Sequence, residues 1–565
     1  MDFGRKKMRL GDVLINNGAI TMDQLKQALE AQKGTGRMLG EVLVDEGILT
    51  AEEIAQALSN QMHLPFVDLK RVDVPDEILN LVPVNVLKKN KVFPYAYAPG
   101  NPNVLQVAMV DPMDMNAMDD IYIITNLQVE PAVTTTRDIM LAIDQYYGQE
   151  DMNAVLESYA NEKTMAEEQM MDVEATENVN SSPIVQLTRE MIDSAVRQRA
   201  SDIHIEPMEH KVRIRYRIDG TLYEKASYSP KLLPAIVARI KIIGGMDISE
   251  KRKPQDGRIT QVVDRQEYDI RVSVLPTVFG EKVVMRLTSK TALTKEKSQL
   301  GLKPEELVQF DRILRNPHGI LLVTGPTGSG KSTTLYTALS ELNQEDVNII
   351  TVEDPVEANI DGINQVHVNP KANLTFATAL RSILRQDPDI IMIGEIRDQE
   401  TASIAVQAAI TGHLVVSTLH TNSAAGTITR LADMGVEPYL ISDAVVGVIA
   451  QRLVRRLCPV CKRAKEATAE EKKMLSREAA ENLTIYEPVG CPQCDQTGYK
   501  GRIGVYEIME MTPKLKVIIS KNGSSEDIKE QALSEGMHTL RMSATQYVLE
   551  GITSFNEMMK VSFDI

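Results

Sequence analysis

A glycine-rich segment in the middle of the chain has the residue types and spacing of a phosphate-binding loop. It reads GPTGSGKST, and it lies between the apolar run at 320–323 and a helical pattern, TTLYTALSEL. Backbone N–H groups of such a loop converge on an anion, and the helix that follows points its positive end at it. Lys331 would reach the β- and γ-phosphates, and Ser332 would ligate Mg²⁺. The predicted nucleotide-binding residues are Gly325, Pro326, Thr327, Gly328, Ser329, Gly330, Lys331, Ser332 and Thr333.

Three more apolar runs, at 347–352, 389–394 and 413–420, end on or enclose side chains that ligate metals or move protons. These side chains are Glu353, Asp354, Glu357, Glu395, His413 and His420. Ligands of an open α/β sheet lie at the carboxyl ends of its strands, so we expect these groups to converge on the nucleotide. Acids are needed there to hold Mg²⁺ and to orient water.

The cysteines form two Cys-x-x-Cys pairs. Four thiolates complete the tetrahedral shell of a structural Zn²⁺ and leave no open position for catalysis. The alternative is four reduced cysteines without a metal. We expect a zinc element over residues 458–494, with the ligands Cys458, Cys461, Cys491 and Cys494.

A strand pattern before the loop collects cations. Residues 211–218 alternate basic and apolar side chains, and a strand with period two places all of the cations on one face. Later strand patterns carry Arg271 and Arg286, and the segment KRKPQDGRI adds Arg258. Such a face can be simply solvated. Guanidinium also suits bidentate phosphate contact, which favours a second domain that closes on the triphosphate.

Length and composition narrow the function further. The 565 residues are too many for one core, and 43% hydrophobic and 25% charged residues are ordinary for a globular protein. The net charge of −16 argues against broad binding to nucleic acid. We find no apolar run of the length that spans a bilayer and no signal peptide, so we expect a cytoplasmic protein.

An internal repeat opens the chain. Residues 9–32 align without gaps on residues 38–61, with 10 of 24 positions identical. Each copy predicts a short helix, a glycine turn, a threonine cap at Thr21 or Thr50, and a second helix. Read by spacing alone, the leucines and glycines indicate packing and helix ends, which would make the repeat a docking bundle.

The pattern along the chain predicts four parts. Residues 1–148 form an N-terminal domain, with the helical repeat at 9–61 and an α/β part at 65–148. Residues 149–181 carry nine acids and one lysine, which is typical of a solvated linker. The arginine-bearing α/β domain spans 182–295, and the nucleotide-binding domain spans 300–565.

The motifs GPTGSGKSTTLY, TVEDPVE, LRQDPDIIMIGEIRD, TGHLVVSTLHTN and the paired Cys-x-x-Cys together resemble the type II/type IV secretion ATPases, the hexameric motors of type II secretion and type IV pilus assembly. The resemblance runs from about residue 182 to the C-terminus. It implies a RecA-like P-loop core behind a smaller, PAS-like α/β domain. Retraction motors of the family generally lack the cysteines and the long N-terminal region, which favours assembly or secretion.

The resemblance also implies roles for individual residues. Glu395 would polarise the attacking water, with Lys331 and Glu357 as further catalytic residues, and Glu353, Asp354 and Glu357 would form an acidic box. His413 and His420 would form a histidine box that senses the γ-phosphate or a neighbouring subunit. Four arginines would reach the nucleotide or a subunit interface: Arg271, Arg286, Arg381 and Arg385.

The repeat resembles the cyclic-di-GMP-binding domain at the N-terminus of bacterial pilus and secretion ATPases. The resemblance implies an apolar groove, with Arg9 stacking on a guanine and glutamines supplying polar contacts. The second copy has Met38 where the first has Arg9. The implied ligand-binding residues are Arg9, Leu10, Gly11, Leu14, Gly18, Leu25, Leu29, Gln32, Leu39, Gly40, Leu43, Gly47, Ile54, Leu58 and Gln61.

Together these patterns predict a multidomain α/β ATPase that hydrolyses ATP with Mg²⁺, assembles as a homohexamer and drives type IV pilus assembly under control by cyclic-di-GMP. Its expected partners are an inner-membrane platform protein and a cytoplasmic ring protein, with no nucleic acid. A type II secretion ATPase is the alternative. A nucleic-acid translocase fits less well, because the chain has no Trp and few aromatic residues for base stacking. The intact Lys331 and Glu395 argue against a scaffold that does not hydrolyse ATP.

Overall fold

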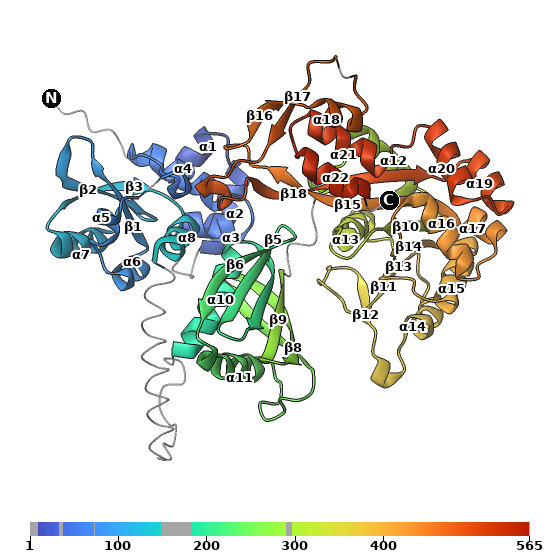
Figure 1. Ribbon diagram of the computed structural model, residues 1–565, viewed down its shortest axis with the longest axis horizontal. Helices are drawn as coiled ribbons and strands as arrows, with labels where there is room; N and C mark the ends of the chain where they lie inside the picture. The colour runs from blue at the N-terminus through green and yellow to red at the C-terminus, as the bar shows by residue number, and fades with distance from the viewer. Residues whose placement is uncertain are drawn as a thin grey trace. The chain divides into compact units, whose positions relative to one another are not determined.

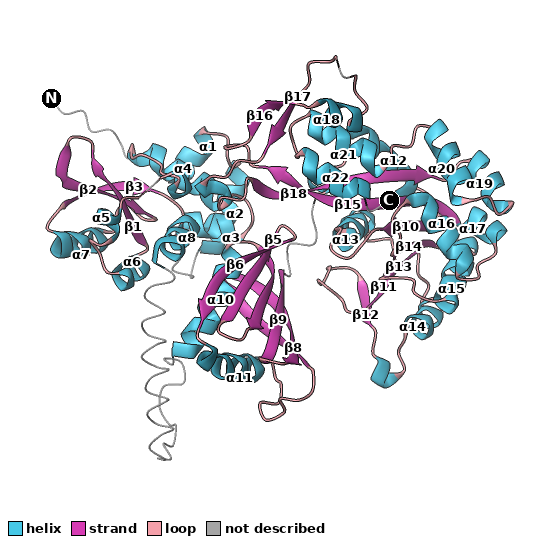
Figure 2. Ribbon diagram, in the orientation of Figure 1, coloured by secondary structure: helices cyan, strands magenta, loops and turns pink. Residues whose placement is uncertain are grey.

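The computed structural model describes residues 10–32, 38–72, 74–147, 183–289, 296–478 and 480–563. Figure 1 traces its helices and strands from the N-terminus to the C-terminus, and the chain divides into two compact units. One holds the described parts of Met1–Ile218, Leu222–Ile259 and Arg271–Arg286, and the other holds those of Asp219–Thr221, Thr260–Ile270 and Leu287–Ile565. Figure 2 shows helices and strands along the chain, as expected for an α/β protein. Arg9 and the predicted linker at 149–181 lie outside the described residues.

The internal repeat forms four short helices. Helix α1 packs on α4, and α2 packs on α3. Thr50 caps its helix as predicted, because its hydroxyl accepts the N–H of Glu53 at 3.2 Å. Thr21 accepts the N–H of Gln24 in the same way at 3.3 Å. The helices are α1 (Leu10–Asn16), α2 (Met22–Gln32), α3 (Leu39–Asp45) and α4 (Ala51–Met62).

Glycines bring these helices together at equivalent places in the two copies. A Cβ on Gly11 would lie 2.9 Å from Cδ1 of Leu25, and a Cβ on Gly40 would lie 2.9 Å from Cγ2 of Ile54. Real Cβ atoms do not approach that closely, so a larger residue at either position would make the neighbouring side chain shift. The two copies of the repeat therefore pack their helices through equivalent glycines.

The part that follows the repeat has a three-stranded sheet. Strand β2 pairs with β1 in antiparallel and with β3 in parallel fashion, which fits the α/β part predicted at 65–148. Phe93 and Leu105 are fully buried in its core. The elements are α5 (Asp76–Leu79), α6 (Val84–Asn90), β1 (Val92–Ala98), β2 (Asn101–Met109), α7 (Met115–Thr125), β3 (Gln128–Val133) and α8 (Thr136–Tyr147).

The arginine-bearing region is a six-stranded sheet in the order β6-β5-β4-β9-β8-β7 with two helices. Along β5 the apolar residues from Val212 to Tyr216 are buried and the arginines between them are half-exposed, which confirms the predicted alternation. The elements are α10 (Pro183–Arg197), β4 (Ala200–Pro207), β5 (Val212–Ile218), β6 (Thr221–Tyr228), α11 (Leu233–Ile243), β7 (Gln255–Val263), β8 (Gln266–Thr277) and β9 (Gly280–Ser289).

The cations of this sheet pair with acids on the middle strand. Glu206 accepts hydrogen bonds from Arg213 at 3.1 Å and Arg215 at 2.7 Å, and Lys282 of β9 lies 3.2 Å away. Burial favours the neutral acid, but the hydrogen bonds from Arg215, Lys282 and Arg213 outweigh it and hold the pKa of Glu206 at about 2. The basic face thus includes an ionised, buried carboxylate.

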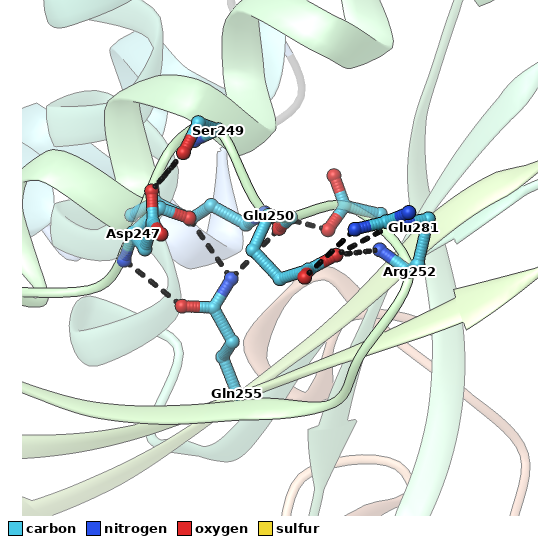
Figure 3. Close-up of polar contacts among 7 residues, drawn as sticks. Asp247, Ser249, Glu250, Arg252, Gln255 and Glu281 are labelled. Carbon is cyan, nitrogen blue, oxygen red and sulfur yellow. Dashed lines mark hydrogen bonds and ion pairs between the residues drawn. The ribbon is translucent and has the colours of Figure 1, made fainter.

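A polar cluster fixes the loop between α11 and β7 (Figure 3). The ammonium of Lys241, 1% exposed, contacts Glu281 at 2.7 Å and donates to the carbonyl of Glu250 at 2.7 Å. The amide of Gln255 donates to the carbonyls of Asp247 and Glu250, each at 2.9 Å. A buried lysine needs such partners, and they set the course of the loop.

The nucleotide-binding region is built on a seven-stranded sheet in the order β12-β11-β13-β14-β10-β15-β18. Neighbouring strands are parallel except for the antiparallel pair β15 and β18. The strands are β10 (Gly319–Thr324), β11 (Ile349–Glu353), β12 (Asn364–His367), β13 (Ile390–Ile393), β14 (Leu414–Leu419), β15 (Val445–Leu457) and β18 (Tyr499–Glu510).

Both faces of this sheet are buried. Ile320 and Leu322 face one apolar cluster, whereas Leu321 and Val323 face another. A strand with a continuous apolar run is typical of this arrangement. Helices α13 and α15 pack against β10 and β14. The helices are α12 (Pro304–Leu314), α13 (Lys331–Leu342), α14 (Phe376–Ile383), α15 (Gln399–Ile410), α16 (Ala424–Asp433) and α17 (Pro438–Ala444).

The remaining elements follow β15. Strands β16 and β17 form a small antiparallel pair within the cysteine region. The described helices contain none with both the length and the apolar character needed to cross a membrane. The elements are β16 (Arg463–Glu466), α18 (Ala469–Met474), β17 (Thr484–Glu487), α19 (Pro513–Ser520), α20 (Ser525–Ser534), α21 (Leu540–Leu549) and α22 (Phe555–Phe563).

Glu507→Ala is expected to destabilise this unit. Glu507, buried on β18, accepts the N–H of Ala424 at 2.7 Å and of Leu540 at 3.3 Å, the first residues of α16 and α21. Losing both bonds should cost about 2–4 kcal/mol and lower the unfolding midpoint by about 5–10 °C in a thermal scan. Glu510→Ala on the same strand breaks an ion pair with the exposed Arg312 and is the control, with a shift of about 2 °C or less. Equal shifts would contradict the capping role.

Candidate active site

The glycine-rich loop follows β10 and leads into α13, so the order strand, loop and helix is as predicted. Gly325, Gly328 and Gly330 have φ of 148°, 79° and 91°, a backbone region that favours glycine. A Cβ on Gly325 would lie 2.4 Å from the carbonyl oxygen of Gln451, in β15. The loop therefore lies directly on β15 and can hold its shape only with glycine there.

Lys331 is the buried cation of the loop. Its ammonium donates to the carbonyls of Gly325 at 2.7 Å and Pro326 at 3.2 Å. Burial lowers the pKa of Lys331 to about 8, and Arg452 adds to this while Glu395 and Glu357 oppose it. An anion beside this lysine would restore the ordinary preference for the charged form.

The loop has a further feature that fits a bound phosphate. The hydroxyl of Ser329, 3% exposed, has no hydrogen-bond partner among the described residues. A buried hydroxyl without a partner is costly, and a phosphate oxygen would satisfy it. Ser332, on the first turn of α13, is half-buried, and its hydroxyl is of the type that ligates Mg²⁺. These residues fit a nucleotide with Mg²⁺.

Glu395 follows β13 and lies at the same edge of the sheet as the loop. One carboxylate oxygen accepts a hydrogen bond from Arg397 at 2.5 Å, and the other lies 3.5 Å from Nε2 of His420, which follows β14. The pKa of His420 is lowered, first by burial and then by Lys331, against the opposing charge of Glu395. The lowered pKa favours the neutral imidazole, whose Nε2 faces the carboxylate of Glu395.

The acidic box divides into two kinds of residue. Glu353 ends β11 and is 4% exposed; its carboxylate accepts hydrogen bonds from Tyr336, from Thr351 at 2.6 Å and from Gln365 at 3.1 Å. Glu357 is half-buried, and its charge acts on Lys331. Asp354 is exposed and acts on Arg397, whose pKa is raised chiefly by its bond to Glu395. Glu357 and Glu395 are thus the acids beside the loop.

The structure does not bring His413 to this edge. His413 precedes β14, and its backbone carbonyl accepts the N–H of Gly319 at the start of β10. Its ring bonds locally to the carbonyl of Ala408, with Nδ1 and O 2.9 Å apart. The predicted histidine box is therefore divided within one chain, with His420 at the loop edge and His413 at the opposite edge.

The predicted arginines lie outside the loop. Arg381, on α14, contacts Glu400 at 2.6 Å and is half-exposed, and Arg385 donates to the carbonyl of Arg381 at 2.7 Å. Arg286, on β9, contacts Asp202 at 3.2 Å, and Arg271 lies on β8 of the same sheet. Arg258, on β7, is in that sheet as well.

Sequence reasoning missed three residues of the site: Arg397, Arg452 and Tyr336. Arg397 stands two positions after Glu395, within the motif LRQDPDIIMIGEIRD, so its place in that motif could have identified it. Arg452 is 5% exposed, and its guanidinium donates to the side chain of Asn422 at 3.0 Å. A Gln-Arg pair inside the apolar run of β15 was its signal. Tyr336 falls at an apolar position of α13, which made it look like core.

The cysteines gather as predicted. The sulfur atoms of Cys458 and Cys491 and of Cys461 and Cys494 are each 3.8 Å apart, and all four lie within 4.8 Å of one another. Backbone N–H groups of Gly490 and others donate to the sulfurs at 3.2–3.3 Å. A compact set of four sulfurs that accept N–H bonds fits a tetrahedral Zn²⁺.

The residues of the N-terminal repeat differ in exposure. Leu14 and Leu43 are 1% and 0% exposed, and they form the core of the bundle with Ile54. Leu29 is 40% exposed, and a half-buried group surrounds the core. That half-buried group is Leu10, Leu25, Gln32, Leu39, Leu58 and Gln61, with Gly11 and Gly40 buried and Gly18 and Gly47 exposed at the turns.

Comparison with known proteins adds to this geometry. The family model for type II/IV secretion system proteins matches residues 177–560, and the MshEN domain model matches residues 62–153. The type IV pilus assembly ATPase PilB of Myxococcus xanthus is 43% identical over 98% of each chain. The type II secretion system ATPase E of Vibrio cholerae is 48% identical over 71% of this chain and 79% of that protein. The structure of the Legionella pneumophila ATPase DotB aligns with 70% of this chain and all of that chain, at a TM-score of 0.51 and 21% identity.

A mostly parallel sheet, a phosphate loop after β10 and acids at the carboxyl ends of its strands define a RecA-like P-loop protein. The family model covers more than half of the residues, and the match to the Myxococcus xanthus protein covers nearly the whole chain. The chain therefore belongs to the type II/IV secretion system protein family. Its second match, to the MshEN domain, begins after the helical repeat and covers the three-stranded sheet.

Proposed function

We propose that the chain is the ATP-hydrolysing motor that assembles a type IV pilus. The observation that carries the proposal is the 43% identity to a type IV pilus assembly ATPase over 98% of both chains, from the repeat to the last helix. The loop supplies the phosphate site, and Glu395 and Glu357 stand beside Lys331. A motor of this kind needs a nucleotide site whose contacts change on hydrolysis, and these residues provide it.

In the proposed reaction, Lys331 and the loop N–H groups bind the phosphates, and the hydroxyl of Ser332 would ligate Mg²⁺. The bound Mg²⁺ would offset the charge that develops on the β- and γ-oxygens. Glu395 orients the attacking water and holds its proton at the oxygen that faces His420. Arg397 fixes the other oxygen of Glu395, and Glu357 orients water from the β11 side.

The remaining residues would act in an assembled ring. We propose a homohexamer in which Arg271, Arg286, Arg381, Arg385 and His413 serve the nucleotide or the interface of a neighbouring subunit. The exposure of Arg286 and Arg381 supports this. The ring would work at the cytoplasmic face of the inner membrane on a platform protein, with a cytoplasmic ring protein as a further partner.

We propose that cyclic-di-GMP binds the N-terminal part and regulates the motor. The motif pattern of the repeat, the half-exposed leucines around its core and the adjacent MshEN match support this. Titration calorimetry on the full chain is expected to give saturable binding, and Arg9→Ala is expected to weaken it at least tenfold. A chain that does not bind at high micromolar ligand would leave the repeat as a docking bundle.

A structural Zn²⁺ at the four cysteines gives a further prediction. The purified chain is expected to contain one Zn²⁺ per chain by elemental analysis, and Cys491→Ser is expected to lose it. A four-thiolate site contributes to folding, so the variant should unfold at lower temperature. A chain without metal that unfolds at the same temperature as the metal-loaded chain would contradict the site. Ser476→Ala, on the segment between the pairs, is the control.

We also propose the four-part division at 1–148, 149–181, 182–295 and 300–565. The match of one family model to 62–153 and of another to 177–560 supports a division near the acidic segment. The cysteine segment at 458–494, which we propose as the zinc element, belongs to the last part.

A type II secretion motor is the second candidate, because the Vibrio cholerae ATPase is 48% identical over the shared region. Deleting the gene in its own organism separates the two candidates. The proposed function predicts loss of surface pili with normal levels of secreted proteins, restored by the wild-type gene and not by one encoding Glu395→Gln. Intact pili with lost secretion would favour the second candidate, and ATPase activity that depends on single-stranded DNA would indicate a translocase.

A further inference from the structure

A buried tyrosine connects the phosphate-binding helix to the acidic box. Tyr336 lies on α13 and is 1% exposed. Its hydroxyl donates to the carboxylate of Glu353 and accepts the backbone N–H of Glu357 at 3.1 Å. One side chain therefore joins the helix that carries Lys331 to both glutamates.

Glu353 is fully engaged within the protein. Besides Tyr336, its carboxylate accepts from the hydroxyl of Thr351 at 2.6 Å and from the amide of Gln365 at 3.1 Å. Only 4% of Glu353 is exposed. Three donors already occupy this buried carboxylate, and a metal ion would have to displace them.

The same cluster holds the backbone that carries Glu357. The side-chain amide of Gln365 makes two bonds to this segment. Its NH₂ group donates to the carbonyl of Ala358 at 3.0 Å, and its oxygen Oε1 accepts the N–H of Ile360 at 2.8 Å. The segment after Glu357 is thus tied to β12 through Gln365, and Glu357 itself is tied to α13 through Tyr336. The charge of the Glu357 carboxylate acts on Lys331.

We propose that Tyr336 is a positioning residue for hydrolysis, which holds Glu357 in register with the phosphate-binding helix, and that Glu353 anchors Tyr336 and is not a ligand of Mg²⁺. The inference rests on the proposed ATPase function. It assigns different roles to two glutamates of the acidic box: Glu353 fixes the position of Tyr336, and Glu357 faces the nucleotide. Small displacements of a group that orients water are costly, which is why such a link is useful.

Tyr336→Phe removes only the hydroxyl. The variant is expected to lose about 10–100-fold in kcat, with KM for ATP within about threefold of wild type, because the phosphate loop is untouched. Binding of a non-hydrolysable ATP analogue, measured on the same preparation, is expected to match wild type. The matched control is Thr351→Val, which removes a different donor to the same carboxylate and leaves the bond to Glu357 in place; its kcat should stay within about twofold.

Glu353→Gln tests the second half of the proposal. The amide can still accept from Tyr336, so the Mg²⁺ concentration that gives half-maximal activity should stay within about twofold of wild type. A metal ligand would instead shift it about tenfold or more. Gln365→Met, which loosens the same segment and keeps Tyr336, should lower kcat and not KM, and it provides a second test of the positioning role.

Three outcomes would overturn the inference. They are an undiminished kcat in Tyr336→Phe, an equal loss in Thr351→Val, and a large Mg²⁺ shift in Glu353→Gln. A wild-type chain that shows no turnover under conditions where it binds ATP would instead contradict the proposed function, so the two failures are distinguishable.

Discussion

A full-length chain carrying Glu395→Gln is expected to bind ATP as tightly as wild type and to hydrolyse it at least about a hundredfold more slowly. Glu395 lies at the end of β13 beside the phosphate loop, held by Arg397 at 2.5 Å and facing His420 at 3.5 Å. The amide keeps the size of the side chain but cannot take a proton from water. Steady-state turnover and equilibrium binding of ATP on one preparation measure the two effects.

The control for this variant is Glu345→Gln. Glu345 is exposed beyond the end of α13, and its turnover should equal that of wild type. A rate that is unchanged in Glu395→Gln would mean that another group activates the water. Glu357 would then be the first candidate, because its charge also acts on Lys331.

Lys331→Ala is expected to raise the Kd for ATP at least about a hundredfold and to lose turnover as a result. In wild type the pKa of Lys331 is about 8, so the lysine is charged below pH 8 and loses its charge above it. Bound phosphate favours the charged form. Binding therefore takes up a proton at high pH, and the Kd for ATP should rise by up to about tenfold per pH unit between pH 8 and 9.5.

Fluorescent-nucleotide titrations from pH 7.5 to 9.5 measure this dependence, with Lys371→Ala, an exposed position, as the control. The control should follow the wild-type curve. A Kd that stays constant over this range would show that Lys331 keeps its proton without a nucleotide, which would contradict the burial argument.

The phosphate loop and its strand were predictable because local sequence decides them. Glycine is required where φ is positive, as at Gly330, and a continuous apolar run is required where a strand is buried on both faces. The same holds for the helix caps at Thr21 and Thr50 and for the cysteine pairs. The loop, the strand and the caps depend on residues close in sequence. The cysteine site depends on four residues of the same type.

The end of a strand at which a residue stands decides at which edge of the sheet it lies. The prediction that both histidines lie at the nucleotide did not take this into account. His413 and His420 stand at the two ends of β14, so the rise of the strand alone separates them by about 20 Å. The alternation of basic residues on β5 was predictable in the same way. Its pairing with Glu206 was not, because the partner lies on another strand.

The roles of Tyr336 and Glu353 depend on contacts between segments distant in sequence. A tyrosine among apolar helix positions indicates core, and only the fold brings its hydroxyl to β11. An acid in a TVEDPVE segment indicates a ligand, and only the structure places three donors around the first of its glutamates. The proposed roles of the arginines at 271, 286, 381 and 385 involve a neighbouring subunit, which the sequence of one chain does not place.

The most direct test of the account is the ATPase rate of the full-length chain across size-separated fractions, with Mg²⁺ and with a chelator in its place. The account predicts that activity follows a hexamer-sized peak, needs Mg²⁺ and disappears in Glu395→Gln. A monomer that hydrolyses ATP as fast as the larger species would contradict it, because the arginines of a neighbouring subunit would then have no part in the reaction.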